Sequence, residues 1–188
     1  MPLRNDSLNW GAVAKAFHWL LAVLIFAQLG LGFWAVAWPL TPTKLDLFFW
    51  HKSIGMILLL LVIMRLLWLL INPHPLFPAS LSRWERNAAG IVHGLIYAVL
   101  ILLPISGWML NSATGVPFKV FDWIQLPALF EPSRKLIGIT IDLHILLSWA
   151  LIILLGAHIL AVLRHHWIKK DITLKRMLPF IRIRQTDI

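Results

Sequence analysis

A single apolar stretch runs without interruption from Ile139 to Leu163 and reads ITIDLHILLSWALIILLGAHILAVL. It is longer than the roughly 20 residues that an α-helix needs to cross the hydrocarbon core of a bilayer. The stretch contains two histidines, His144 and His158, which are 14 residues apart. Fourteen residues of α-helix rise about 21 Å and fall about 40° short of four full turns. Both imidazoles therefore lie on one face of a predicted membrane helix, one near each end.

Three further stretches are apolar enough to cross a membrane, and they cover approximately residues 17–38, 50–71 and 89–110. The connections between them are rich in proline, which ends helices and marks their boundaries. The sequence contains no soluble domain between the four spans and no tandem repeat. We therefore expect one all-α domain over residues 1–188, folded as a transmembrane four-helix bundle.

The composition excludes several classes of protein. Of the 188 residues, 60% are hydrophobic and 13% are charged, and this charged share is about half that of an average soluble domain. An ordinary soluble enzyme is therefore excluded. The chain has no cysteine, which excludes disulfides, iron–sulfur clusters, thiolate zinc sites and covalently attached c-type haem.

The positive charge of the chain indicates its orientation in the membrane. The net charge is +9, and 12 of the 17 Lys and Arg residues flank the spans on the side of the two termini. Because cytoplasmic segments carry the excess of Lys and Arg, both termini are expected in the cytoplasm. The same charge attracts anionic lipid, so we expect contact with membrane lipid and not with nucleic acid.

Ionisable residues inside membrane spans are costly and are functional candidates by default. Five of the eight histidines lie in or at the predicted spans: His18, His51, His93, His144 and His158. Depth in the membrane pairs His18 with His158 near the cytoplasmic side, and His51 with His144 near the outer side. The crossed pairings would need ligands about 20 Å apart to meet one ion.

Two facing imidazoles suit one kind of metal centre. Zinc takes three or four protein ligands, and the spans offer no thiolate and, apart from Asp142, no carboxylate to complete them. Haem iron needs only two axial ligands, because the porphyrin fills its equatorial positions. We therefore predict two non-covalent bis-histidine haems of b type, with His18 and His158 on the inner iron and His51 and His144 on the outer iron. The alternative is a set of core histidines without a metal.

Other residues at the predicted depth of each haem are candidate cofactor contacts. His93 competes with His18 as the inner ligand, and we favour His18 because small neighbours leave it more room. With Tyr97 one turn later, His93 could instead donate to a propionate or border a quinone site. Arg65 could pair with an inner propionate or extend to the membrane surface.

The outer side offers its own set of candidates. Lys52, together with Arg134 or Lys135, could pair with the outer propionates. Gly32 and Gly107 follow His18 and His93 by 14 residues, which places them at the outer level, where a haem could approach the backbone. The apolar segment 116–123 either lies in the membrane interface as a lid over this end or is an ordinary loop.

These residues resemble a known family, the bacterial cytochrome b561 family. The resemblance covers nearly the whole chain and rests on five segments: AFHW at 16–19, WHKSIG at 50–55, DLH at 142–144, GAH at 156–158 and HHWIKKDITLKRMLP at 165–179. It implies a four-helix, di-haem protein of the bacterial inner membrane that exchanges electrons with the quinone pool. It also implies that His18, His51, His144 and His158 are the haem ligands, in agreement with the depth argument.

We therefore expect an oxidoreductase that transfers electrons across the inner membrane between a one-electron donor on the outer side and the quinone pool. One branch of the family passes an electron from superoxide to ubiquinone, and the outer basic residues could attract such an anion. The first alternative is a haem-bearing anchor subunit of a hydrogenase-like or dehydrogenase complex. The second alternative is a small transporter or proton channel that uses the histidines without haem.

Overall fold

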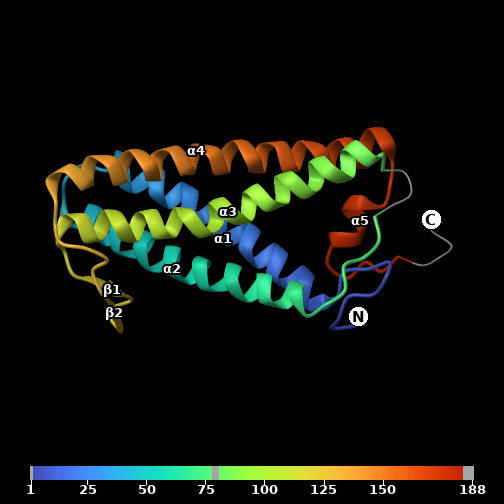
Figure 1. Ribbon diagram of the computed structural model, residues 1–188, viewed down its shortest axis with the longest axis horizontal. Coiled ribbons are helices and arrows are strands. Elements are labelled where there is room, and N and C mark those ends of the chain that lie inside the picture. The colour runs from blue at the N-terminus through green and yellow to red at the C-terminus, as the bar shows by residue number, and fades with distance from the viewer. Residues whose placement is uncertain (1, 78–80, 184–188) are drawn as a thin grey trace. The chain divides into compact units, whose positions relative to one another are not determined.

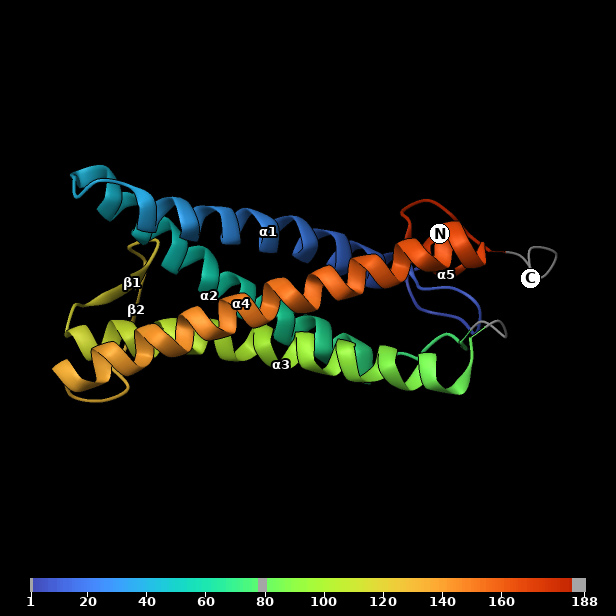
Figure 2. The same ribbon diagram turned by 90° about the horizontal axis from the view of Figure 1, so that it is seen from above.

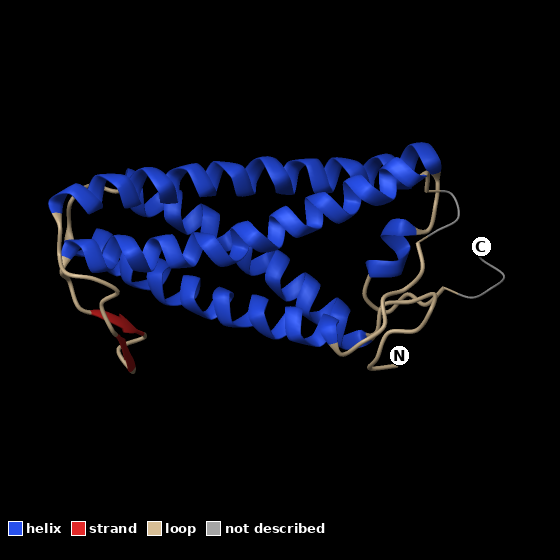
Figure 3. Cartoon of the chain, viewed as in Figure 1, coloured by secondary structure: helices blue, strands red, loops and turns tan. Residues whose placement is uncertain are grey.

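The computed structural model describes residues 2–77 and 81–183, and most of them are helical (Figure 1). The helices are α1 Ala12–Ala37, α2 Pro42–Leu70, α3 Arg83–Thr114, α4 Arg134–Arg164, a π-helical turn η1 His165–Lys169, and α5 Thr173–Met177. Two short strands, β1 Phe118–Val120 and β2 Ile124–Leu126, follow α3 (Figure 3). Four of the described helices are long and apolar enough to cross a membrane, so the predicted all-α membrane fold is confirmed.

The long helices extend beyond the apolar stretches that predicted them. α2 begins at Pro42 rather than near residue 50, because proline is favoured in the first turn, where its missing N–H is not needed. α3 begins at Arg83 rather than near residue 89. Apolar composition indicates where a helix crosses the bilayer, whereas local capping residues determine where it begins.

The chain divides into two compact units. The first unit comprises the described residues of Met1–Leu20, Ile63–Tyr97 and Ile152–Ile188, and the second comprises Leu21–Val62 and Ala98–Leu151. Each of the four long helices contributes one part to each unit. The expectation of one membrane domain over residues 1–188 stays a prediction.

Much of the helix surface in both units is apolar and exposed. Large side chains such as Val23, Leu146, Ile153 and Leu160 have between 65% and 68% of their surface accessible. A water-soluble protein does not leave so many apolar side chains uncovered, but a membrane helix presents them to lipid. Polar side chains such as Ser53, Ser106 and Thr140 are buried instead.

In the first unit, polar contacts join the chain termini. Lys15 at the start of α1 is almost fully buried, and its Nζ donates to the carbonyl oxygens of Leu178 at 2.9 Å and Ile181 at 2.6 Å. Asn9 and Ile183 exchange two hydrogen bonds, one in each direction. Residues 9–15 and residues 178–183 are therefore joined by hydrogen bonds.

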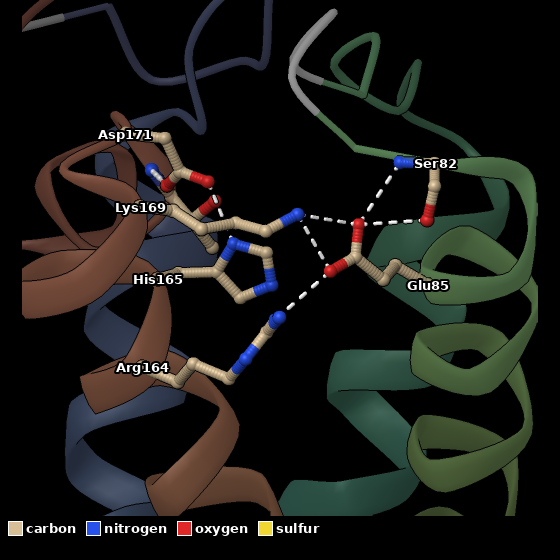
Figure 4. Close-up of polar contacts among 7 residues, drawn as sticks. Ser82, Glu85, Arg164, His165, Lys169 and Asp171 are labelled. Carbon is tan, nitrogen blue, oxygen red and sulfur yellow. Dashed lines mark hydrogen bonds and ion pairs between the residues drawn. The ribbon is translucent and has the colours of Figure 1, made fainter.

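A cluster of charged side chains joins α3 to the end of α4 in the same unit (Figure 4). The backbone N–H and hydroxyl of Ser82 both donate to the carboxylate of Glu85, and the first of these bonds is one half of a capping box at the start of α3. The same buried carboxylate pairs with Arg164 at 2.9 Å and with Lys169 at 2.6 Å. Glu85 thus begins one membrane helix and attaches it to another.

Next to this cluster, Asp171 contacts His165 at 2.6 Å (Figure 4). Burial alone would raise the pKa of Asp171, but hydrogen bonds from Thr173 and the contact with His165 lower the pKa below its usual range. The carboxylate is therefore ionised at neutral pH, and its contribution to stability is lost only in acid, as the pH falls through the lowered pKa.

In the second unit, the segment after α3 forms a two-stranded antiparallel hairpin that the sequence analysis does not predict (Figure 2). Phe118 pairs with Leu126, and Val120 pairs with Ile124. The turn residues Phe121 and Asp122 have φ angles of 49° and 59°, the positive values that tight hairpin turns require. Phe118 and Val120 are buried, and Trp123 is exposed.

The Glu85 cluster leads to a prediction about stability. Glu85→Gln keeps the size of the side chain but removes the charge that pairs with Arg164 and Lys169, which leaves two cations beside a neutral group. We expect a lower thermal midpoint of the detergent-solubilised protein, measured by circular dichroism at 222 nm. The control is Glu131→Gln at an exposed acid in the second unit. Equal midpoints for both variants would contradict this role of Glu85.

Candidate haem sites

The second unit brings together the two histidines that the sequence analysis pairs on the outer side. His51 lies on α2 and His144 on α4, and their ring centroids are 6.2 Å apart with the planes at 79°. An imidazole nitrogen bonds a metal ion at about 2.0 Å, so two imidazoles on opposite sides of one ion place their centroids about 6 Å apart. The spacing of this pair fits one metal ion held between two imidazoles.

The tautomer of His144 is compatible with metal binding. Ser106 on α3 donates its hydroxyl proton to the carbonyl oxygen of Leu103 at 2.7 Å, and its oxygen also lies 2.8 Å from Nδ1 of His144. Because a hydroxyl has only one proton, Nδ1 of His144 must carry the proton and donate to Ser106. Nε2 is then unprotonated, with a lone pair for a metal ion, and Ser106 orients the ring.

Two glycines make room for these imidazoles. A Cβ atom at Gly32 would lie 2.8 Å from Cε1 of His51, and one at Gly107 would lie 3.3 Å from Cε1 of His144. The sequence analysis predicts both glycines at this level, as places where a porphyrin approaches the backbone. In the structure each glycine leaves space for a histidine ring, and approach of a porphyrin to the backbone there stays a prediction.

His51 differs from His144 in its hydrogen bonds. Its Nδ1 atom is buried and has no hydrogen-bond partner within the described parts of the chain. Its backbone carbonyl accepts a hydrogen bond from the side chain of Gln28 on α1. A buried ring nitrogen without a partner is costly in an apolar environment, which is consistent with a site built for a group that the protein itself does not supply.

The first unit brings together the inner pair and also His93. The ring centroids of His18 on α1 and His158 on α4 are 6.3 Å apart, which matches the spacing of the pair in the second unit. The centroid of His93 on α3 is 5.3 Å from that of His158, which is closer than two ligands on opposite sides of one ion would be. The geometry therefore favours His18 over His93 as the partner of His158.

Among the described residues, neither pair is part of a larger set of metal ligands. Within residues 2–77 and 81–183, no group of three or more His, Asp or Glu side chains is placed to hold a metal ion. A zinc site would need at least three such ligands, whereas haem iron needs two. The donor set of both pairs therefore fits haem.

Arg65 lies in the interior of the first unit. Its side chain is buried, with Nε donating to the hydroxyl of Tyr97 at 2.7 Å and Nη1 donating to the carbonyl oxygen of Ala14 at 3.4 Å. None of the ion pairs formed among the described residues involves Arg65. Of the two sequence-based alternatives, the structure favours a buried guanidinium that can pair with an anion over one that extends to the surface.

The basic residues predicted for the outer haem are dispersed in the second unit. Lys52 donates to the side chain of Asn111 at 3.1 Å, and its Nζ lies 5.5 Å from the ring centroid of Phe118 in the hairpin. Arg134 and Lys135, at the start of α4, are both exposed. Pairing of any of the three with a propionate stays a prediction.

The sequence analysis does not identify Ser106 and Gln28, although both contact a histidine of the second unit. Both are polar residues within predicted apolar spans, and that exception to the apolar pattern is the signal that could have identified them. Their partners could not be predicted, because these contacts join different helices.

Comparison with known proteins identifies the family. A family model described as prokaryotic cytochrome b561 matches residues 9–180. The chain belongs to the prokaryotic cytochrome b561 family. The resemblance seen in the sequence is therefore confirmed, and the family implies binding of b-type haem, electron transport and an oxidoreductase role in a membrane.

Three relatives show how similar other members are. Cytochrome b561 homolog 2 of Escherichia coli (strain K12) is 35% identical over 184 residues, which cover 95% of each chain. A probable superoxide oxidase, CybB of Yersinia pestis, is 33% identical over 129 residues, or 69% of this chain and 73% of that protein. Cytochrome b561 homolog 1 of Escherichia coli (strain K12) is 28% identical over 131 residues, with the same coverage.

The hydrogen bond between Ser106 and His144 leads to a prediction for this cytochrome b561. Loss of a partner that orients a metal-binding histidine typically weakens binding by about 10- to 100-fold. We expect Ser106→Ala to weaken the binding of one equivalent of haem by about this factor, as measured by transfer of haem to apomyoglobin. The control is Ser148→Ala, which removes a bond to the backbone carbonyl of His144 and not to its ring. Equal retention of haem in both variants would contradict the prediction.

Proposed function

We propose that this member of the cytochrome b561 family binds two b-type haems and transfers electrons across the bacterial inner membrane. In the proposed function, a one-electron donor on the non-cytoplasmic side is oxidised and the quinone pool is reduced. The observation that carries the proposal is the equal spacing of two histidine pairs, at 6.2 Å in the second unit and 6.3 Å in the first. His51 and His144 would hold one haem, and His18 and His158 the other.

Each histidine pair would hold haem by two imidazoles and leave no open position on the metal, so the bound haem would supply one-electron transfer rather than activation of oxygen. The protein contributes position and charge. Gly32 and Gly107 leave room for the rings of the second unit, and Ser106 fixes the tautomer of His144. Substrates would then react at the edge of each site and not at the metal.

In the first unit, Arg65 is the residue best suited to pair with a haem propionate. A buried guanidinium requires a counter-charge, and its bond to Tyr97 holds it in place. His93 lies beside the same site and is exposed, so it could donate a hydrogen bond to a propionate or to a bound quinone. Ubiquinone is the proposed acceptor.

Superoxide is the donor that we propose on the outer side. One relative is named a probable superoxide oxidase, and it covers 69% of this chain at 33% identity. The second unit carries the basic residues Lys52, Lys119, Arg134 and Lys135, and positive charge at a site raises the encounter rate of an anion. The positive-inside rule, applied to the same chain, places both termini in the cytoplasm.

The first test measures the haem content of the purified protein and of each of three histidine variants. We expect two haems per chain by pyridine haemochrome assay. His51→Ala and His18→Ala should each remove one equivalent, because each loses one of two axial ligands. His93→Gln should retain both. Loss of haem from His93→Gln and retention by His18→Ala would reverse the assignment in the first unit, and a colourless protein would refute the proposal.

The activity separates the proposed function from its alternative. Purified protein should reduce ubiquinone when superoxide is generated by xanthine oxidase, and superoxide dismutase should abolish the reaction. A haem-bearing anchor subunit of a larger hydrogenase-like or dehydrogenase complex would contain both haems and show no such activity alone.

The exposed basic residues lead to a separate prediction. The double substitution Arg134→Gln and Lys135→Gln should slow reduction by superoxide and weaken its dependence on ionic strength, because it removes attraction for an anion. The control is Lys170→Gln with Lys175→Gln, two exposed lysines of the first unit. An unchanged rate and salt dependence, measured by stopped flow, would dismiss the role of Arg134 and Lys135.

A further inference from the structure

The hairpin of the second unit is attached to the residues on either side of His51. The backbone N–H of Phe121, in the turn between β1 and β2, donates to the hydroxyl of Ser53 on α2 at 3.0 Å. The ring of Phe121 also packs edge-on against Trp50, with centroids 5.7 Å apart. The segment Trp50–Ser53 thus contacts the hairpin directly before and shortly after His51.

A third contact strengthens the attachment. Lys52 lies over the ring of Phe118 and donates to Asn111, the residue near the end of α3 whose side chain also donates to the carbonyl oxygen of Val116. Ser53 is completely buried, so water cannot replace the bond from Phe121. The hairpin is therefore attached to α2 by a partly buried hydrogen bond and two contacts of aromatic rings.

The two histidines of this unit are oriented by different means. The ring of His144 has a hydrogen bond to Ser106, which fixes its plane. The ring of His51 has no equivalent bond at Nδ1 within the described chain segments. The plane of the His51 ring therefore depends on its helix backbone and on the packing against Gly32.

Two contacts from other elements hold that backbone. Gln28 on α1 donates to the carbonyl oxygen of His51 itself, and the hairpin holds Ser53 two residues later. Phe121 adopts a positive φ, which is unfavourable for a bulky residue and persists only when surrounding contacts maintain it. The bond to Ser53 and the contact with Trp50 are the contacts that maintain it here.

We propose that the β1–β2 hairpin positions His51 for haem ligation, and that Ser53 is the positioning residue through which it acts. This inference rests on the proposed function, in which His51 and His144 hold one haem. Release of the hairpin would let the segment Trp50–Ser53 shift and the imidazole plane of His51 rotate against that of His144. The angle between two axial imidazole planes determines the electron paramagnetic resonance signal of a low-spin ferric haem, so this signal reports the effect directly.

The experiment compares three serine variants of the full-length, haem-loaded protein. Ser53→Ala removes the acceptor for Phe121, Ser53→Thr retains a hydroxyl, and Ser112→Ala is the matched control. Ser112 on α3 is also buried, and its hydroxyl accepts the backbone N–H of Leu129 at 3.1 Å in the same connection. The control therefore removes the same kind of hydrogen bond from the segment between α3 and α4, but it does not affect a contact with α2.

We expect Ser53→Ala to shift one of two low-spin signals and the midpoint potential of the same haem, and to leave the other haem unchanged. Ser53→Thr should restore the parent signal, and Ser112→Ala should leave both signals as they are. Identical spectra for Ser53→Ala and the parent would overturn the inference. Equal shifts in Ser53→Ala and Ser112→Ala would also overturn it, because the effect would then come from a loosened connection alone.

A second variant covers the case in which Ser53→Ala does not fold. Trp50→Leu removes the ring contact with Phe121 at a residue that is half exposed, and it should shift the same signal by a smaller amount. An unshifted signal in Trp50→Leu would then contradict the proposal that the hairpin positions His51. If the parent protein lacks the second haem, or if His51→Ala retains it, the proposed function fails. If only the serine comparison fails, the proposed function stands without this inference.

Discussion

An imidazole buried among apolar helices is costly unless its ring nitrogens find partners, and the histidine pairs of both units face this constraint. Within each unit, one histidine of α4 faces a histidine of another helix at a centroid spacing near 6 Å. That distance is too long for a hydrogen bond between the rings and right for a metal ion between them. In the second unit, Gly32 and Gly107 leave space for the two rings, and Ser106 holds the ring of His144.

Much of this arrangement could be predicted from the sequence because it depends on position along single helices. The 14-residue spacing of His144 and His158 on one apolar helix places both on the same face, and depth then selects His51 and His18 as their neighbours. The structure brings these same pairs together. Arg65 could be predicted to face the interior for the same reason, since its position follows from helical periodicity.

Contacts that join different elements could not be predicted in the same way. The bond between Ser106 and His144 depends on the packing of α3 against α4, and no local pattern encodes it. The hairpin is formed by only three residues on each strand, and its turn residues Phe121 and Asp122 lack the Asn-Gly or Asp-Gly signal of such turns. One of these turn residues, Phe121, contacts α2, which lies far away in the sequence.

The buried ammonium of Lys15 has a consequence for biosynthesis. Its two acceptors, the carbonyl oxygens of Leu178 and Ile181, are separated from it by 163 and 166 residues of sequence and are therefore synthesised much later. While the first helix is being inserted, this cation has neither acceptor available and must remain hydrated. Lys15 therefore completes its native contacts only after Leu178 and Ile181 have been synthesised, and a nascent chain halted before Leu178 would keep this segment open to proteases.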